Sequence, residues 1–301
     1  MNITLRQLSY LLALDRTGSF SRAAEAVHVT QPALSMQIKE LEAELQLVLV
    51  ERLPRAARLT QAGRMVVERA RRIEAELRAL SSEARRAQGH LSLGIIPTIA
   101  PYLLPRALPR LRASFGGLRL REARTESLLA ELAAGRLDAA LIATPAPECT
   151  EETLAEDRFL LAGTADLIAR NRGLAPEALD PGALLLLEEG HCLADQALAL
   201  CGLTRAAQAV DLGASSLSTL CSLVAQGMGL TLVPEIAALA ETNAAPQVTL
   251  MRFETEPARQ LRLVRRRDAP DADHWFTPLA ALLAVDAQAI IDAARDRFTR
   301  N

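Results

Sequence analysis

Apolar residues recur at helical spacing in three short segments at the start of the chain. The first begins at Leu5 and stops at the Thr17-Gly18-Ser19 turn, and the second spans residues 21–27. The third follows Thr30, a suitable N-cap, and runs to about Leu45. Because a tight turn joins the last two segments, the pattern predicts a helix-turn-helix.

The pattern changes over residues 49–88. Residues 49–60 place Pro54 among arginine and acidic positions and predict a β wing. Residues 61–88 predict one long helix with a narrow apolar stripe formed by Val66, Ile73, Leu77 and Leu80. A long helix with such a stripe is more often a seam between two copies than a rod in solvent, so this segment is expected to dimerise.

From residue 89 onward the pattern predicts strands that alternate with helices. Strands are expected at residues 91–96, 118–123, 139–142, 184–187, 209–212, 230–233 and 261–264, and helices at 101–115, 127–134, 194–200, 216–226 and 275–294. Such alternation predicts a mostly parallel α/β sheet. It occurs in two successive sets, which predict two hinged halves of the ligand-binding-protein type.

The predicted fold is an α/β regulatory domain of two subdomains, periplasmic-binding-protein-like, preceded by a mostly α winged helix-turn-helix and a long linker helix. Residues 1–60 are expected to bind DNA, residues 61–88 to link and dimerise, and residues 89–301 to regulate. The regulatory domain is expected to divide into residues 89–160 plus 266–301 and residues 161–265.

Charge is distributed in the way this division predicts. The formal net charge of the chain is −2. Residues 1–88 hold 14 basic and 10 acidic side chains, whereas the remainder holds 20 and 26. A mildly basic head on an acidic body is typical of a protein that touches DNA at one end. Neither a signal-peptide core nor a stretch of roughly 18–20 apolar residues is evident, so a cytoplasmic protein without a membrane partner is expected.

The segment Gly190-His191-Cys192-Leu193-Ala194-Asp195-Gln196 carries the candidate chemistry, together with Cys201 nine residues after the first cysteine. The N–H groups of a helix beginning at Ala194 would favour the thiolate of Cys192. In a reducing compartment such a pair is more often catalytic or sensing than structural. From the residues alone, two small buried side chains remain an equal alternative.

A zinc site is the weaker alternative, because it needs four ligands and only His191, Cys192 and Cys201 are at hand. No metal or cofactor is therefore expected. Cys149 and Cys221 have no basic neighbour in the sequence and are expected to be structural.

Two sets of residues resemble a known family. Val29-Thr30-Gln31-Pro32-Ala33-Leu34-Ser35 with Ile38-Lys39-Glu40-Leu41-Glu42 closely resembles the helix-turn-helix of LysR-type transcriptional regulators, and Arg52, Leu59-Thr60 and Ala62-Gly63 resemble its wing and linker. Residues 96–105, Thr125 before Leu128-Leu129, Leu137-Asp138-Ala139, and residues 190–197 with Cys201 resemble the hydrogen-peroxide-sensing members. The resemblance covers nearly the whole chain.

The helix-turn-helix is expected to read promoter DNA. By their positions, Gln31, Ser35 and Gln37 are expected to face the major groove, and phosphate is expected to meet Thr30, Lys39, Arg52, Arg55 and Arg58. The alternative is a small helical bundle with a solvated face. Each palindromic half-site needs its own copy, which implies at least a dimer.

The resemblance implies a peroxide pocket and a thiol switch. The implied pocket residues are Thr98, Thr125, His191, Asp195 and Arg266. Hydrogen peroxide would oxidise Cys192 to a sulfenic acid, and Cys201 would convert this to a disulfide that switches transcription of antioxidant genes. Such a regulator is not an enzyme; it is a homotetramer, a dimer of dimers, that works with RNA polymerase and is reset by a thiol reductant.

Two other functions compete with this interpretation. A LysR-type regulator that binds a small-molecule inducer between the two regulatory subdomains would have no need of the cysteines. A thiol peroxidase would show multiple turnovers and would have no use for the first 88 residues.

The spacing of the two cysteines adds a geometric condition. If residues 194–200 are helical, nine residues separate the sulfurs by roughly 13 Å at about 1.5 Å per residue. A disulfide needs Cα atoms within about 7 Å. Formation of the Cys192–Cys201 bond is therefore expected to unwind or refold this helix.

Overall fold

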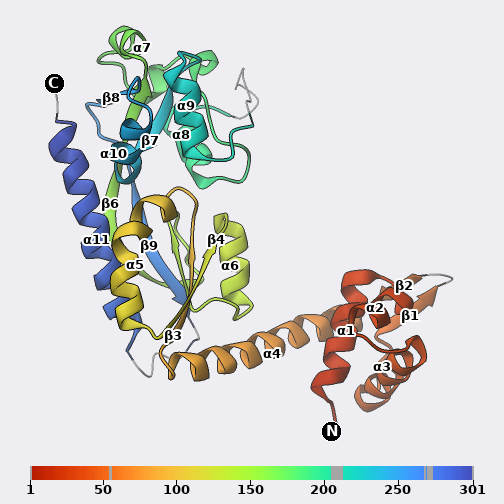
Figure 1. The fold of residues 1–301 in the computed structure, drawn as a ribbon. Helices are drawn as coiled ribbons and strands as arrows, with labels where there is room; N and C mark the ends of the chain where they lie inside the picture. Colours follow the sequence, from red (N-terminus) through yellow and green to blue (C-terminus); the bar gives the residue numbers. More distant parts are fainter. Residues whose placement is uncertain (1, 54–55, 205–212, 268, 270–273, 300–301) are drawn as a thin grey trace. The chain divides into compact units, whose positions relative to one another are not determined.

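The computed structural model describes residues 2–53, 56–204, 213–267, 269 and 274–299. It separates into two compact units, Met1–Glu83 and Ala84–Asn301, which are considered one at a time (Figure 1).

The first unit is a winged helix-turn-helix, as the sequence predicted. Its elements are α1 (Leu5–Thr17), α2 (Phe20–Ala26), α3 (Gln31–Leu45), the antiparallel pair β1 (Val50–Leu53) and β2 (Ala56–Leu59), and the start of α4 (Gln61–Arg86). A capping box between Thr4 and Gln7 begins α1, and Gly18 ends it at φ 61°, a left-handed conformation that glycine adopts without strain. Fully buried Leu34, Ile38 and Leu41 fix one face of α3 against α1 and α2.

The second unit begins with a parallel α/β layer. Its elements are β3 (His90–Ile95), α5 (Ala100–Ser114), β4 (Gly117–Glu122), α6 (Thr125–Ala133) and β5 (Ala139–Ile142). Strand β3 lies between β4 and β5, and both pairings are parallel. The C-terminal helix α11 (Phe276–Arg297) contributes Phe276, Leu279 and Leu283 to the core of this layer, which we term the first core.

Two long strands carry the chain between this layer and a second one. They are β6 (Cys149–Gly163) and β9 (Ala258–Arg266), which pair antiparallel with each other. The second layer adds α7 (Ala165–Arg170), two short 3-10 turns, η1 (Pro176–Ala178) and η2 (Pro181–Ala183), and then α8 (Cys192–Leu200), α9 (Leu217–Ala225), β7 (Thr231–Pro234), α10 (Glu235–Ala244) and β8 (Thr249–Arg252). Its buried side chains form the second core.

The structure corrects the expected sheet. The strand order is β4-β3-β5-β9-β6-β7, with β8 beside β6, and among the described strands of this unit only the β3–β4 and β3–β5 pairings are parallel. The expected strand at residues 184–187 is wrong, because only Leu184 forms an isolated bridge, to Leu230. The expected strand at 209–212 lies outside the described residues. The sequence reasoning missed β6, β8, α7 and α10.

Arg86, at the end of α4, is anchored in the second unit. It donates a hydrogen bond to Asp138, and its guanidinium lies 4.8 Å from the centre of the Trp275 ring. The other Asp138 oxygen accepts a hydrogen bond of 2.7 Å from the backbone N–H of Ser92 in β3. Both side chains of the ion pair are at least nine-tenths buried. The last turn of the linker helix is therefore fixed to the strands of the first core.

Helix α11 is long and apolar enough to cross a membrane by length and composition, and no other helix in the described part of the chain meets that test. The same helix buries Phe276, Leu283 and Ile291 in the first core. A core helix of this kind is weak evidence for a membrane span.

Candidate functional site

Helix α3 presents a polar flank beside its buried face. Gln31, Ser35 and Lys39 are spaced four residues apart, so they follow one line along the helix. Gln31 and Lys39 are exposed, as is Thr30, which occupies the N-cap position without a side-chain capping bond. These residues can therefore meet DNA from one flank of α3.

Gln37 lies on a different flank of α3. Two residues of helix turn it by about 200° from Ser35. Its Nε2 donates a hydrogen bond of 2.7 Å to Glu40. Met36, which is 55% exposed, lies between the two flanks on the outward side. The structure thus does not place Gln37 with Gln31 and Ser35.

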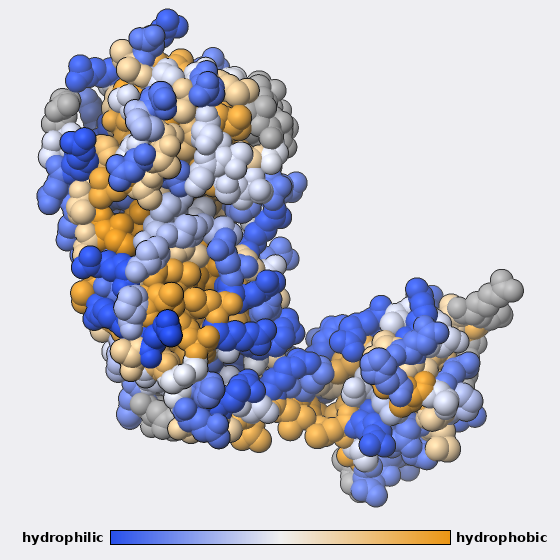
Figure 2. Space-filling view, in the orientation of Figure 1, coloured by the Kyte–Doolittle hydropathy of each residue, from blue (hydrophilic) through white to orange (hydrophobic). Residues whose placement is uncertain are grey.

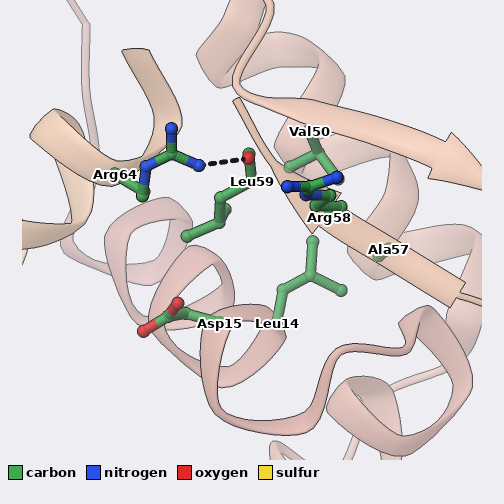
Figure 3. Close-up of a pocket in the computed structure, with 7 residues that line it drawn as sticks. All are labelled: Leu14, Asp15, Val50, Ala57, Arg58, Leu59 and Arg64. Atoms are coloured by element: carbon green, nitrogen blue, oxygen red, sulfur yellow. Dashed lines mark hydrogen bonds between the residues drawn. The ribbon is translucent and has the colours of Figure 1, made fainter. Parts of the chain in front are cut away.

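The wing meets the start of the linker helix around a pocket of about 200 Å³ (Figure 3). Arg58 from β2 and Arg64 from α4 line it together with Asp15 from α1. Arg64 donates a hydrogen bond of 3.0 Å to the carbonyl of Leu59, and Arg58 is exposed. Arg52 belongs to β1, and Arg55 lies outside the described residues.

The carboxyl ends of β3 and β4 carry the two expected threonines. Thr98 follows β3 by three residues and Thr125 follows β4 by three residues. Parallel strands gather their carboxyl ends at one edge of a sheet, the usual ligand position in open α/β sheets. Thr98 is buried and Thr125 is half-buried at the first position of α6.

The start of α8 is tied to the same edge. Gln196 donates a hydrogen bond of 2.7 Å to the carbonyl of Ala143, the residue after β5. Arg124, which precedes Thr125, pairs with Glu188. Gly190 has φ +89°, a left-handed conformation that glycine adopts without strain, and a Cβ there would also displace the Arg124 guanidinium, 2.8 Å away. The segment from Glu188 to Gln196 therefore lies over the carboxyl ends of β4 and β5.

Cys192 is the first residue of α8 and is half-buried against the first core. His191, the N-cap residue, is buried, and its Nε2 lies 3.7 Å from Oε1 of Glu188. Asp195 is exposed in the first turn of the same helix. Cys192 therefore lies at the positive end of the α8 helix dipole.

Two polar atoms at this edge are buried without a hydrogen-bond partner among the described residues. They are Oγ1 of Thr125 and Oε1 of Gln196. Buried polar atoms in native proteins are almost always paired with protein or water. One lies on α6 and one on α8, so each is free to bond a small polar molecule at this edge.

Arg259, rather than Arg266, is the cation at Thr98. Its Nη1 donates to Oγ1 of Thr98 at 3.0 Å and its Nη2 donates to the Thr98 carbonyl at 3.2 Å. Asp157 accepts from Nε of Arg259 at 2.9 Å, and both side chains are buried. Burial raises the pKa of Asp157, and the charge of Arg259 is the largest influence that opposes this rise.

The strand register explains the correction. In β9, Arg262 lies opposite Ile142, the last residue of β5, whereas Arg266 lies opposite Cys149. Arg266 is therefore four residues, or about 13 Å, further toward the amino end of β5. Arg259 lies on the other side of Arg262, at the threonine edge. The alternation of polar and apolar residues from Gln260 to Leu263 was the signal that could have extended the expected strand toward Arg259.

Cys201 occupies a different environment from Cys192. It is the C-cap residue of α8, it is buried in the second core, and both cysteines are free thiols. Burial raises the pKa of Cys201 to about 11, and the charge of Glu177 contributes in the same direction. The helix between the cysteines is intact, so their Cα atoms are roughly 13 Å apart.

The other two cysteines lie in apolar surroundings. Burial raises the pKa of Cys149, and it raises that of Cys221 to about 12, with the charge of Glu241 adding to the effect. Among the described residues, no cluster of three or more histidine, cysteine or acidic side chains could hold a metal ion.

Comparisons with known proteins agree with this geometry. Residues 5–64 match the family model described as bacterial regulatory helix-turn-helix protein, lysR family, and residues 84–283 match the LysR substrate binding domain. The chain is 40% identical over 277 residues to the DNA-binding transcriptional dual regulator OxyR of Escherichia coli, covering 89% of this chain and 91% of the relative. It is 38% identical over 277 residues to the transcriptional regulator EstR of Acinetobacter baylyi, covering 89% and 92%.

A solved structure also shows similarity to a LysR-family regulator. The chain is similar to a cysteine mutant of OxyR from Corynebacterium glutamicum with hydrogen peroxide bound, at a TM-score of 0.64 and 30% identity. The match covers 100% of this chain and 98% of that one.

Proposed function

The chain belongs to the LysR family of bacterial transcriptional regulators, and from that premise we propose that hydrogen peroxide switches it through Cys192 and Cys201. Within the family it is OxyR-like. One observation carries the proposal: Cys192 begins α8 where that helix is tied to the strand edge that holds Thr98 and Thr125.

The first proposed step is oxidation of Cys192. Its thiolate attacks one oxygen of the peroxide, the O–O bond breaks, and the other oxygen leaves as hydroxide and takes a proton to become water. Cys192 is left as a sulfenic acid. Thr125 and Gln196, whose buried oxygens lack partners, would orient the peroxide, and His191 and Asp195 would border it.

The second proposed step closes the disulfide. The sulfur of Cys201 attacks the sulfenic sulfur, an S–S bond forms, and water leaves. The Cα atoms must come within about 7 Å, which the intact α8 prevents. Closure therefore draws Cys201 out of the second core and unfolds α8, and this refolding is the switch.

The output is regulated DNA binding. We propose that residues 1–60 contact promoter DNA, that residues 61–88 dimerise, and that residues 89–301 sense the oxidant in a homotetramer. The proposed groove contacts are Gln31 and Ser35, without Gln37 on the other flank of α3, and the proposed phosphate contacts are Thr30, Lys39, Arg52, Arg55 and Arg58. A cytoplasmic thiol reductant would reverse the switch, and RNA polymerase would respond to it. Each switching event consumes one peroxide, so the protein is a sensor and not an enzyme of repeated turnover.

Mass mapping and DNA footprinting test the proposal. Full-length protein treated with one equivalent of hydrogen peroxide is digested without reduction, and a Cys192–Cys201 crosslinked peptide is expected. The footprint on a promoter selected by the reduced protein should change with peroxide, and Cys192→Ser should abolish the change. Absence of the crosslink, or a normal response by Cys201→Ser, contradicts the mechanism.

The match of residues 84–283 to the LysR substrate binding domain keeps a second function in view, a regulator that binds a small inducer between the subdomains. The same experiment separates the two, because an inducer-responsive protein would respond unchanged when Cys192 is serine.

A further inference from the structure

The hydrogen bonds of Thr98 give its hydroxyl a direction. Oγ1 of Thr98 accepts from Nη1 of Arg259 at 3.0 Å. A hydroxyl has one hydrogen to donate, and the accepted bond leaves that hydrogen to be donated elsewhere. No acceptor for it lies among the described residues. Thr98 is only 2% exposed at the strand edge, so its hydrogen is available to a molecule bound there.

Arg259 takes its orientation from Asp157. The two residues are direct partners in the β6–β9 ladder, and Oδ2 of Asp157 accepts from Nε of Arg259 at 2.9 Å. A carboxylate only accepts hydrogen bonds, so it holds the Nε edge of the planar guanidinium. Both Nη atoms are then left for Thr98, one for its hydroxyl and one for its carbonyl.

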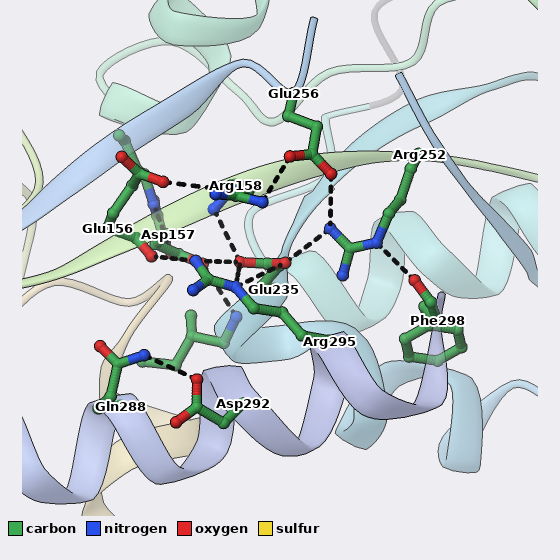
Figure 4. A network of polar contacts seen from close by, with 12 residues as sticks. Glu156, Asp157, Arg158, Glu235, Arg252, Glu256, Gln288, Asp292, Arg295 and Phe298 are labelled. Carbon is green, nitrogen blue, oxygen red and sulfur yellow. Dashed lines mark hydrogen bonds and ion pairs between the residues drawn. The ribbon is translucent and has the colours of Figure 1, made fainter. Parts of the chain in front are cut away.

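Asp157 is itself held from a second side. Its Oδ1 accepts a hydrogen bond of 3.0 Å from the backbone N–H of Ile236, in the first turn of α10. The preceding residue, Glu235, is fully buried and accepts hydrogen bonds from Arg252 at 2.8 Å and Arg295 at 3.0 Å (Figure 4). The start of α10 is therefore anchored to β8 and α11, and it fixes the carboxylate of Asp157 in turn.

We propose that Asp157 is a positioning residue for the peroxide reaction: through Arg259 it directs the Thr98 hydroxyl hydrogen to the oxygen that leaves when the O–O bond breaks. The inference rests on the proposed function. The Cys192 sulfur supplies the electron pair, the leaving oxygen departs as hydroxide, and its proton comes from solvent. Thr98 donates a hydrogen bond to the developing charge and keeps its proton.

The test measures two reactions of Cys192 in full-length protein that carries Cys201→Ser. Sulfenic acid formation with hydrogen peroxide reports the step that uses Thr98, and alkylation by iodoacetamide reports the thiol alone. Loss of one direct donor to a developing oxyanion costs about 100-fold or more, so Asp157, two hydrogen bonds behind the donor Thr98, is expected to cost less, about tenfold. Asp157→Asn should lower the peroxide rate about tenfold and leave the alkylation rate unchanged.

Two comparisons exclude a merely structural effect. Asp157→Glu, which keeps the charge, should restore part of the peroxide rate. Thr98→Val should slow the peroxide reaction. Adding Asp157→Asn to Thr98→Val should slow the reaction by no more than about twofold further, because both changes interrupt the same series of hydrogen bonds from Asp157 through Arg259 to Thr98. Glu156→Gln, on the exposed side of the same strand, is the matched control and should react at the parent rate.

Asp157→Asn leaves Arg259 buried without its counter-ion and can fail to fold. In that case Asp157→Asn with Arg259→Gln, a neutral pair, is compared with Arg259→Gln alone, and equal peroxide rates are expected. The inference is overturned if Asp157→Asn reacts with peroxide at the parent rate, if alkylation slows equally, or if the neutral pair is slower than Arg259→Gln. If the Cys201→Ser parent itself does not react with peroxide, the proposed function fails first.

Discussion

Cys192 and Cys201 stand at opposite ends of one helix and in two different cores. Cys192 packs against the first core at the N-terminus of α8, where the helix dipole favours negative charge. Cys201 lies at the C-terminus within the second core, where burial keeps its thiol protonated and raises its pKa to about 11. In the proposed mechanism, Cys192 would react with peroxide first, and Cys201 would react only after α8 opens.

Alkylation of Cys201 in the reduced, folded protein should be slow and strongly dependent on pH. A free thiol with a pKa of about 8.5 is roughly a quarter ionised at pH 8, whereas a thiol with a pKa of about 11 is about a thousandth ionised. We expect iodoacetamide to modify Cys201 at least about a hundredfold more slowly than in the denatured chain at pH 8. The rate should rise as the pH approaches 11. Mass spectrometry of timed samples measures this, and equal rates in folded and denatured protein would refute it.

Arg259 and Arg266 differ in their distance from the threonine edge, and this difference can be tested directly. Arg259→Gln removes the donor to Thr98 and should slow sulfenic acid formation at Cys192 by about tenfold or more. Arg266→Gln, at the far end of the same strand, should change the rate by less than about twofold. Stopped-flow measurement of the reaction with hydrogen peroxide gives the rates of both variants. If Arg266→Gln is the slower of the two, Arg266 rather than Arg259 belongs to the site.

The candidate site could be predicted from the sequence only where its residues are local. Thr98, Thr125 and the His191-Cys192 pair follow recognisable segments, and the structure places Thr98 and Thr125 at one strand edge with α8 tied to it. The cation could not be placed in this way. Which arginine of β9 reaches Thr98 depends on the register between β9 and its neighbours, and two arginines seven residues apart look alike until that register is known.

At the scale of the element, the proposed switch requires α8 to be stable enough to keep the thiols apart and weak enough to open. It has nine residues, a length at which an isolated helix is not stable in water. Packing of Leu193, Ala197 and Leu198 in the second core therefore holds it. Its outer face, which includes exposed Ala199, contributes helix propensity without packing.

Ala199→Gly should speed disulfide closure without altering the peroxide step. Glycine in a helix interior costs about 1 kcal/mol relative to alanine, which increases the opened population about fivefold. The rate of Cys192–Cys201 bond formation should rise by up to that factor. The sulfenic acid rate, measured with Cys201→Ser, should stay the same.

The matched control is Ala281→Gly, an exposed alanine of α11. It should leave closure unchanged. Non-reducing gels of acid-quenched samples give the rates. An unchanged closure rate in Ala199→Gly would show that opening of α8 does not limit the switch.

Helices and strands could be predicted where buried apolar residues recur at helical or strand spacing. They could not be predicted where the buried residues are charged. The three helices of the first unit, β5 and α5 appear close to their expected ends. Strand β6 was missed because Glu151, Glu156 and Asp157 make it look like a surface loop, although β9 supplies basic partners for Glu151 and Asp157. Residues 184–187 are all buried, yet a short apolar run does not distinguish a strand from a buried extended segment.

At the scale of the whole molecule, the linker helix α4 carries apolar side chains that its own unit does not cover. Met65, Ile73, Leu77 and Leu80 are exposed large hydrophobic residues, and Figure 2 shows apolar surface along this helix. Leu77 and Ile73 also line a small pocket with Leu5, Leu8 and Leu12 of α1. A narrow apolar stripe of this kind is the surface through which the proposed dimer would pair two copies of the helix.

Leu77→Glu should both separate the linker helices of the proposed dimer and weaken DNA binding. A carboxylate at the seam would be buried without a partner, which disfavours association. We expect the mass from light scattering to fall by half, from a tetramer to a dimer held by the regulatory bodies. A dimer that carries two DNA-binding units binds an operator with two half-sites about 100-fold or more tightly than one unit alone, because the second unit is held close to its half-site. Affinity of Leu77→Glu for such an operator should therefore fall by about 100-fold. Arg72→Glu, about 140° round the helix from Leu77, adds the same carboxylate on an exposed face and should leave the mass unchanged. If Leu77→Glu keeps the parent mass and affinity, the stripe serves another purpose and the dimer is built elsewhere.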